Sequence, residues 1–173
     1  DLEELTRGHA ADDPDHVKPK SKAEGGVFGT AVAHFNVLEF QKRGLPHRHL
    51  LLWLNRDEAD VMSDDLDKAA TVIDTIISAQ LPANPELKEQ ILKTNIHHCT
   101  ADTCSKGGYC KNFYPKKERA QTYVSPPGEV DDFIQYARSA SVTGQARDKE
   151  GKLIEVSAAN VVPYSPYLTL RHL

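Results

Sequence analysis

The sequence has little cysteine, one methionine, one tryptophan and no long hydrophobic run. Its three cysteines are an odd number and lie close together, which disfavours the disulfide framework of a small secreted domain. The longest apolar run, 50–54, is far shorter than the roughly 20 residues of a membrane-spanning helix. The first residues are acidic where a secretory signal would be basic. These absences predict an intracellular chain with reduced thiols and no membrane partner.

The sequence also lacks a strong excess of either charge. Its 21 Lys and Arg residues stand against 25 Asp and Glu residues, which gives a net charge of −4. This balance excludes a protein that coats nucleic acid by bulk positive charge, but it allows a local basic groove. A length of 173 residues suits one domain. We expect an N-terminal arm or linker at 1–25 and one domain at 26–173.

A β-hairpin is predicted near the start of the domain. Residues 27–41 are rich in β-branched and aromatic side chains and alternate in polarity, which indicates a strand. Residues 42–46 contain Gly and Pro and are typical of a turn. The apolar residues that follow, up to position 54, predict a second, buried strand.

Metal-binding side chains fall on one face of this hairpin. His47 and His49 are two residues apart, so they project from the same side of a strand. A turn at 42–46 places Gln41 opposite His47 and Glu39 opposite His49, with Cβ atoms about 5 Å apart. Two imidazoles and one carboxylate make a compact metal site with positions open for a substrate. The alternative is a histidine-rich strand end with no metal.

Helices are predicted after the hairpin. The stretch 63–80 has an apolar stripe at helical spacing, with Ser63 as its N-cap. Proline residues separate it from a second helix at about 86–94. Ser165 followed by proline predicts the start of a last helix.

The segment 97–117 is a predicted zinc-binding insertion. Three thiolates and one imidazole complete a tetrahedral structural zinc site. The donors are Cys99, Cys104 and Cys110, together with His97 or His98. Buried thiols without a metal are the alternative.

The end of this insertion interleaves bases and aromatic residues. Its residues 111–117 read Lys-Asn-Phe-Tyr-Pro-Lys-Lys. Such a pattern suits a single nucleic-acid strand, which binds through phosphate contacts and base stacking. A solvated basic loop is the alternative.

Tyr164 and Tyr167 are three residues apart near the end of the chain, so they share one face of a helix that contains both. A phenol can act as a nucleophile when a base or a metal-polarised electrophile is near. Two aromatic residues of the core or surface are the alternative.

These motifs together resemble a known family. Residues 38–54, which end in His-Arg-His-Leu-Leu-Leu-Trp-Leu, look like the signature of the Rep domain of Helitron transposases, which are HUH endonucleases. The resemblance continues through 73–82, the cysteine segment with 113–117, and 161–168. It covers about Gly26 to the C-terminus.

The resemblance implies a mixed α/β (α+β) fold of the HUH-endonuclease (RRM- or palm-like) type, with a central antiparallel sheet flanked by helices. It implies a catalytic Mg²⁺ or Mn²⁺ held by His47 and His49, with Glu39 as the third ligand and Gln41 as the fallback. Tyr164 and Tyr167 match the family's two tyrosines.

The implied activity is that of a metal-dependent single-stranded DNA endonuclease and strand transferase. It would nick through a covalent 5′-phosphotyrosine at a transposon end or origin, in rolling-circle transposition. The implied partner is a helicase domain in the full-length protein, since no Walker motif occurs here. The compartment is the nucleus if the host is eukaryotic. The residues expected on DNA are Lys42, Arg43, Arg48, Lys111, Lys116 and Lys117.

Arg48 departs from the family, whose motif has a hydrophobic residue at this position. It supports a different function, namely a non-catalytic, zinc-stabilised module that binds single-stranded nucleic acid. A metal-dependent hydrolase that uses water is a third candidate, and it predicts no covalent adduct.

Overall fold

The structure, a computed structural model, describes residues 27–28, 30–40, 44, 46–55, 63–99, 104–126, 128–129 and 134–171. The chain divides between Asp64 and Asp65 into two units, here named the hairpin unit and the mixed unit. The predicted arm at 1–25 lies outside the described residues. Of the helices within the described ranges, none is long and apolar enough to cross a bilayer.

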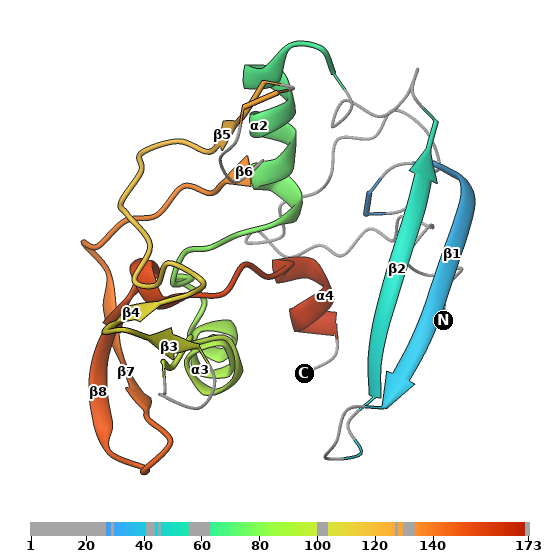
Figure 1. The fold of residues 1–173 in the computed structure, drawn as a ribbon. Coiled ribbons are helices and arrows are strands. Elements are labelled where there is room, and N and C mark those ends of the chain that lie inside the picture. The colour runs from blue at the N-terminus through green and yellow to red at the C-terminus, as the bar shows by residue number, and fades with distance from the viewer. Residues whose placement is uncertain are drawn as a thin grey trace. The chain divides into compact units, whose positions relative to one another are not determined.

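The hairpin unit contains the two longest strands, β1 (Ala31–Phe40) and β2 (Pro46–Leu54). They pair antiparallel, as predicted, and lie side by side along their length (Figure 1). The loop between them includes Gly44, whose φ of 73° lies in the left-handed region that glycine adopts without steric cost.

The predicted register of this hairpin is wrong by two residues. Glu39, and not Gln41, lies opposite His47, while Val37 lies opposite His49. The reason is that β1 ends at Phe40 and β2 already begins at Pro46, which a strand tolerates as its first residue. A shift of two residues keeps every side chain on its predicted face, because strand side chains alternate with a period of two.

The mixed unit begins with α2 (Leu66–Ile76). Its N-cap is Asp65, whose carboxylate accepts from the backbone N–H groups of Asp67 and Lys68 at 3.1 and 3.2 Å. The predicted N-cap Ser63 is therefore wrong. The helix also ends before position 80, because the backbone of Ser78 pairs with that of Tyr164 through two hydrogen bonds of 2.8 and 2.9 Å.

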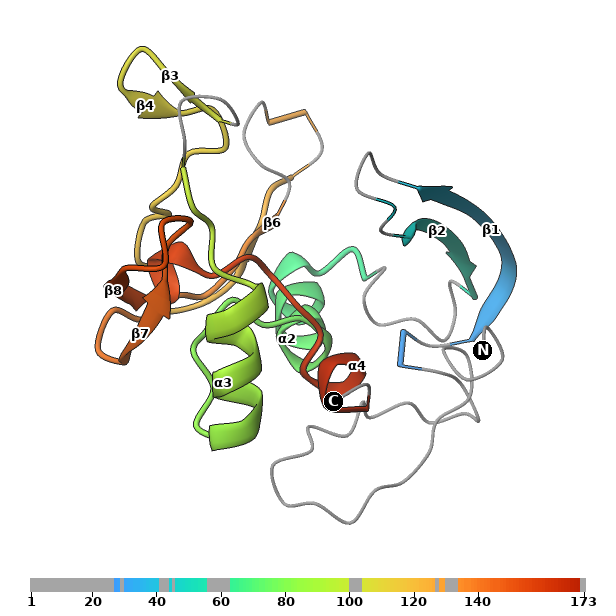
Figure 2. The same ribbon diagram turned by 90° about the horizontal axis from the view of Figure 1, so that it is seen from below.

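The second helix, α3 (Pro85–Thr94), is capped by the side chain of Asn84, which accepts from the Leu87 N–H at 3.0 Å. It carries Ile91, which is fully buried, into the core of the unit. The strand β7 (Thr143–Arg147) packs on α3, and Figures 1 and 2 both place the hairpin of β7 and β8 (Leu153–Ser157) beside this helix. Gly144 permits the approach, since a Cβ there would lie 2.9 Å from Leu92 Cδ2.

The remaining elements are short. The strand pairs are β3 (Ser105–Lys106) with β4 (Tyr109–Cys110), β5 (Tyr123–Val124) with β6 (Ile134–Gln135), and β7 with β8 (Leu153–Ser157). A 3₁₀ turn, η2 (Ala158–Asn160), leads to α4 (Pro166–Arg171), the predicted last helix. The core cluster consists of Leu81, Leu87, Ile91, Ile96, Ala146, Val156, Val161 and Tyr164.

The mixed α/β class with antiparallel pairing is confirmed. Within the described residues, however, the strands form four sheets of two strands each. Four of these strands, β3, β4, β5 and β6, are only two residues long. The single central sheet of an HUH endonuclease therefore stays a prediction.

Candidate functional site

The first candidate site is the donor set Glu39, His47 and His49 on the β1–β2 hairpin. The imidazole centroids of His47 and His49 lie 4.6 Å apart, with the rings at 72° to each other. Nε2 of His49 lies 3.5 Å from Oε2 of Glu39, a diagonal contact across the strand pair. These two side chains are 63% and 57% exposed, so their donor atoms are open to an ion and to a substrate.

Arg48 lies on the other face of the hairpin. It sits between the two histidines on β2, opposite Leu38, and successive strand residues point to opposite sides. Its guanidinium therefore does not line the same surface as the two imidazoles. The other residues assigned to this region, Gln41, Lys42 and Arg43, lie outside the described residues.

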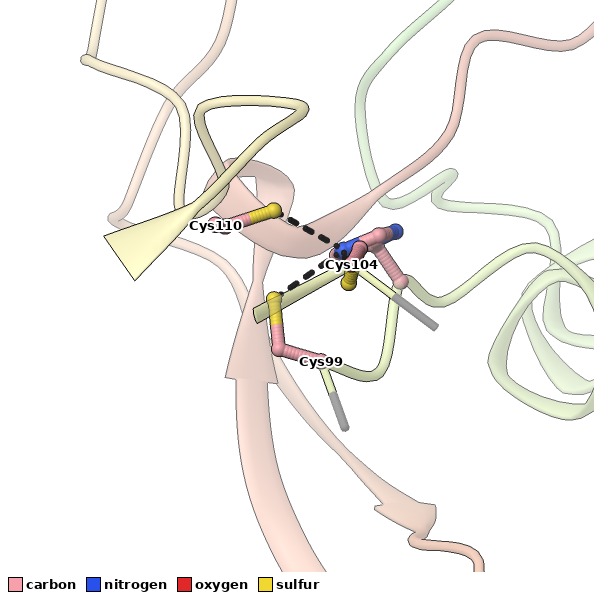
Figure 3. A group of neighbouring side chains, drawn as sticks. Cys99, Cys104 and Cys110 are labelled. Carbon is pink, nitrogen blue, oxygen red and sulfur yellow. Dashed lines mark hydrogen bonds between the residues drawn. The ribbon is translucent and has the colours of Figure 1, made fainter. Parts of the chain in front are cut away.

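The second candidate site is a cluster of four donors in the mixed unit, here named the Cys/His cluster. Nε2 of His97 lies 3.1 Å from Cys99 Sγ, 3.4 Å from Cys104 Sγ and 3.3 Å from Cys110 Sγ. Figure 3 shows the side chains of Cys99, Cys104 and Cys110 gathered in one place, with dashed lines that mark the contacts of the Cys99 and Cys110 sulfurs. The four ligand atoms all lie within 4.8 Å of one another, in the one such group found among the described residues.

The donors of the Cys/His cluster suit zinc. Zinc bonds of ordinary length to sulfur and nitrogen give a tetrahedron with N···S edges of about 3.6 Å. The observed N···S distances are slightly shorter, so a small expansion would admit the ion. Of the two histidines that the sequence left open, the structure brings His97 to the thiols, because its ring carries the nitrogen that all three approach.

A tight turn holds two of the cysteines. Cys104 directly precedes β3 and Cys110 is the last residue of β4, and the turn residues Gly107 and Gly108 between these strands both have positive φ. The Lys111 N–H donates to the Cys104 carbonyl at 2.8 Å, and the Asn112 N–H donates to Cys110 Sγ at 3.3 Å. Hydrogen bonds to a sulfur stabilise its thiolate form, the form that binds a metal.

The pKa values of the cluster follow these contacts. Burial opposes the thiolate of Cys110, but hydrogen bonds, first from the Tyr114 N–H, outweigh it and lower the pKa of Cys110 to about 7. The hydrogen bond with Cys110, together with burial, raises the pKa of Cys99 to about 12. Burial and nearby positive charge lower the pKa of His97, which favours the neutral imidazole that a metal requires.

The two candidate tyrosines have different surroundings. Tyr164 is buried, and its phenol donates to the Gln80 carbonyl at 3.2 Å. Burial raises the pKa of Tyr164, with an opposing effect from a hydrogen bond to Ser78. Tyr167 is partly exposed on α4, where its phenol oxygen accepts from Nη1 of Arg171 at 3.1 Å. Tyr164 is thus built into the core, while Tyr167 is accessible.

A hollow of about 690 Å³, here named the basic groove, lies in the mixed unit. Five cationic residues and one acid line it: Lys111, Lys116, Lys117, Arg119, Arg138 and Glu118. The predicted basic stretch 111–117 forms one wall. The other wall, 134–138, was missed, because long-range contacts bring these two segments together, namely the backbone pairing of Arg119 with Arg138 and the pairing of β5 with β6.

Comparison with known proteins gives one partial match. Residues 10–52 match the family described as the Helitron helicase-like domain at the N-terminus, which supports a relationship to Helitron proteins. The match covers less than half of the chain, but it includes β1 and most of β2, with Glu39, His47 and His49. No curated protein and no solved structure matches the chain.

Proposed function

We propose that this chain is a metal-dependent nicking domain for single-stranded DNA, of the kind that rolling-circle transposition by a Helitron protein requires. The observation that carries the proposal is that Glu39, His47 and His49 share one exposed face of the hairpin, with Glu39 in contact with His49 and the two imidazoles adjacent, inside the stretch that matches the Helitron model. In the full-length protein, a helicase domain would supply the single strand, in the nucleus of a eukaryotic host.

The hairpin donors fit a divalent ion. Two imidazoles and one carboxylate leave coordination positions for water and substrate, as a catalytic Mg²⁺ or Mn²⁺ site needs. When bound there, such an ion would withdraw charge from the scissile phosphate. Because His49 and Glu39 are more than half exposed, a DNA backbone can approach them without displacing other side chains.

The chemical step is a transesterification at phosphorus. A tyrosine oxygen attacks the phosphorus and loses its proton, the bond to the 3′ oxygen breaks, and that oxygen leaves as a 3′-hydroxyl after taking up a proton. The products are a 5′-phosphotyrosine and a free 3′ end, so the strand can be rejoined. Tyr167 is the better candidate nucleophile, since Tyr164 is buried with its phenol bound to a carbonyl.

The test is formation of a covalent protein–DNA adduct. Single-stranded oligonucleotides labelled at either end are incubated with the chain and Mn²⁺, and the products are separated under denaturing conditions. We expect the label to stay on the protein only with the fragment 3′ of the nick, and only when Mn²⁺ is added. Omission of Mn²⁺ is a better control than a chelator, which would also attack the Cys/His cluster.

Two variants test the tyrosine assignment. Tyr167→Phe should abolish the adduct, while Tyr164→Phe should keep it. Cleavage without any adduct would instead support a metal-dependent hydrolase that uses water. An adduct that persists when both tyrosines are replaced by Phe in one chain would show that neither tyrosine is the nucleophile.

A second candidate function is a zinc-stabilised module that binds single-stranded nucleic acid without cleaving it. The burial of Tyr164 favours it, because one of the two tyrosines that the nicking reaction would use serves the core. Under this function, both Tyr→Phe variants and the Mn²⁺-free chain would bind DNA as the unchanged protein does, and no adduct would form.

A further inference from the structure

We propose that the basic groove holds an unpaired nucleotide of the DNA strand, with Phe113 as the platform on which its base stacks. This inference rests on the proposed function for the identity of the ligand as single-stranded DNA. It assigns the binding of the strand to the basic groove of the mixed unit, and the stacking of a base to Phe113, an aromatic residue to which the sequence alone gives no role.

Phe113 is presented to solvent by a constrained backbone. Its side chain is 71% exposed, and its φ of 56° lies in the left-handed region, which is uncommon for a bulky residue. Such a conformation is unfavourable for a side chain of this size and persists only where the surroundings enforce it. Here the Phe113 N–H donates to the Cys110 carbonyl at 2.9 Å, so the cluster's own loop holds the ring out.

The charge around Phe113 suits a phosphate backbone. Of the cations that line the groove, Lys111, Lys117 and Arg119 are exposed. The single acid, Glu118, turns its carboxylate to the Ala140 N–H, with which it is hydrogen-bonded. A groove with bases beside an exposed aromatic ring is the arrangement that binds single strands, through phosphate contacts and stacking together.

Tyr114 couples the groove to the Cys/His cluster. Its ring stacks on that of His97, with centroids 4.1 Å apart and the planes at 18°. On the groove side, the Arg138 guanidinium lies 6.0 Å from the same ring and donates to the Val161 carbonyl at 2.8 Å. A metal bound by His97 would thus restrict the motion of residues 111–117, the wall of the groove that carries Phe113.

The test measures binding without the chemistry of nicking. The His49→Ala chain, loaded with zinc and kept free of Mn²⁺, is titrated against a fluorescent oligothymidylate of about 12 nucleotides. In this background Phe113→Ala should weaken binding about tenfold, as the loss of one stacked base does. Phe113→Trp should restore it. The matched control is Tyr109→Ala, because Tyr109 is also an exposed aromatic, at 65%, but does not line the groove.

A second variant tests the phosphate contacts. Lys117→Ala should reduce the slope of log binding constant against log salt by about 0.7, the value for one phosphate contact on a single strand. Unchanged binding in Phe113→Ala, equal weakening in Tyr109→Ala, or equally tight binding of a blunt duplex would overturn the inference. If these results coincide with an intact Mn²⁺-dependent adduct in the unsubstituted chain, the proposed function stands and only the groove assignment falls.

Discussion

The hairpin unit and the mixed unit bring metal-binding side chains together in different ways. In the hairpin, Glu39 and His49 are neighbours through strand pairing alone, and both remain exposed. In the Cys/His cluster, Cys104 and Cys110 are buried, and a turn holds them around His97. An open set with free positions suits an exchangeable catalytic ion, whereas a closed set of four suits a structural one.

The two units differ in burial as well. Phe35, Leu51 and Trp53 of the hairpin are 59%, 55% and 49% exposed, while Ile91 and Val161 of the mixed unit are completely buried. A two-stranded hairpin is at best marginally stable by itself, whereas a buried apolar cluster supplies most of a domain's stability. Damage to the mixed unit should therefore cost folding, and damage to the hairpin donors should cost chemistry.

The largest effect is expected at the Cys/His cluster. His97→Ala removes one of four ligands, so we expect loss of stoichiometric zinc and a destabilisation on the order of 4 kcal/mol, as metal loss causes. Zinc content and thermal unfolding measure both effects. The matched control is His98→Ala, the adjacent histidine that does not join the cluster. Equal loss of zinc in both variants would contradict the assignment of His97.

The next largest effect is expected in the core of the mixed unit. Ile91→Ala removes a fully buried side chain and should lower the free energy of unfolding by about 3 kcal/mol, through lost burial and the cavity left behind. Phe35→Ala, in the hairpin, should cost less than about 1 kcal/mol, because Phe35 is 59% exposed. Urea unfolding followed by circular dichroism compares the two. A larger loss in Phe35→Ala would show that the hairpin unit, and not the mixed unit, carries more of the stability.

The sequence predicted the hairpin unit better than the mixed unit, because the faces of a strand follow from local alternation alone. Strand alternation places His47 and His49 on one face whatever the register, so their shared face was predicted correctly although the pairing was wrong by two residues. The cap of α2 was missed because Ser63 and Asp65 are both good N-cap residues, and the choice depends on which side chain reaches the first free N–H groups.

Long-range contacts limited the rest. The spacing of the three cysteines predicted a metal site, but it did not distinguish His97 from His98. That choice depends on the direction of the chain after Ile96, which is fixed where the His97 N–H donates to the Asn160 carbonyl. The second wall of the basic groove could not be predicted, since Tyr136 and Arg138 carry no local signal that pairs them with residues 111–119. The burial of Tyr164 likewise depends on its pairing with Ser78.

A smaller effect is expected at alkaline pH. Burial raises the pKa values of Tyr114, Tyr136 and Tyr164 above the ordinary value of 10.0. Because the raised pKa favours the protonated phenol in the folded state, this stability is complete below pH 10 and is lost as the pH rises through the folded-state values. Phenolate absorbance should show late-titrating tyrosines, and Tyr164→Phe should remove one. An unchanged number of late titrations would contradict the burial of Tyr164.

The smallest effect on stability is expected at the hairpin donors, where the comparison of the two units is sharpest. Because the side chains of Glu39 and His49 are more than half exposed, Glu39→Gln and His49→Ala should change the free energy of unfolding by less than about 0.5 kcal/mol. Both should nevertheless abolish Mn²⁺ binding, measured by the electron paramagnetic resonance of the free ion. Arg48→Ala is the matched control: the Arg48 side chain leaves β2 on the opposite face, so this variant should keep Mn²⁺ binding.

If His49→Ala instead unfolded the chain, the imidazole would be needed for folding, and the hairpin donors would have a structural role like that of the Cys/His cluster. If the chain kept both its stability and its Mn²⁺ affinity in these variants, the shared face of the three side chains would be a consequence of strand geometry, and the ion would bind elsewhere.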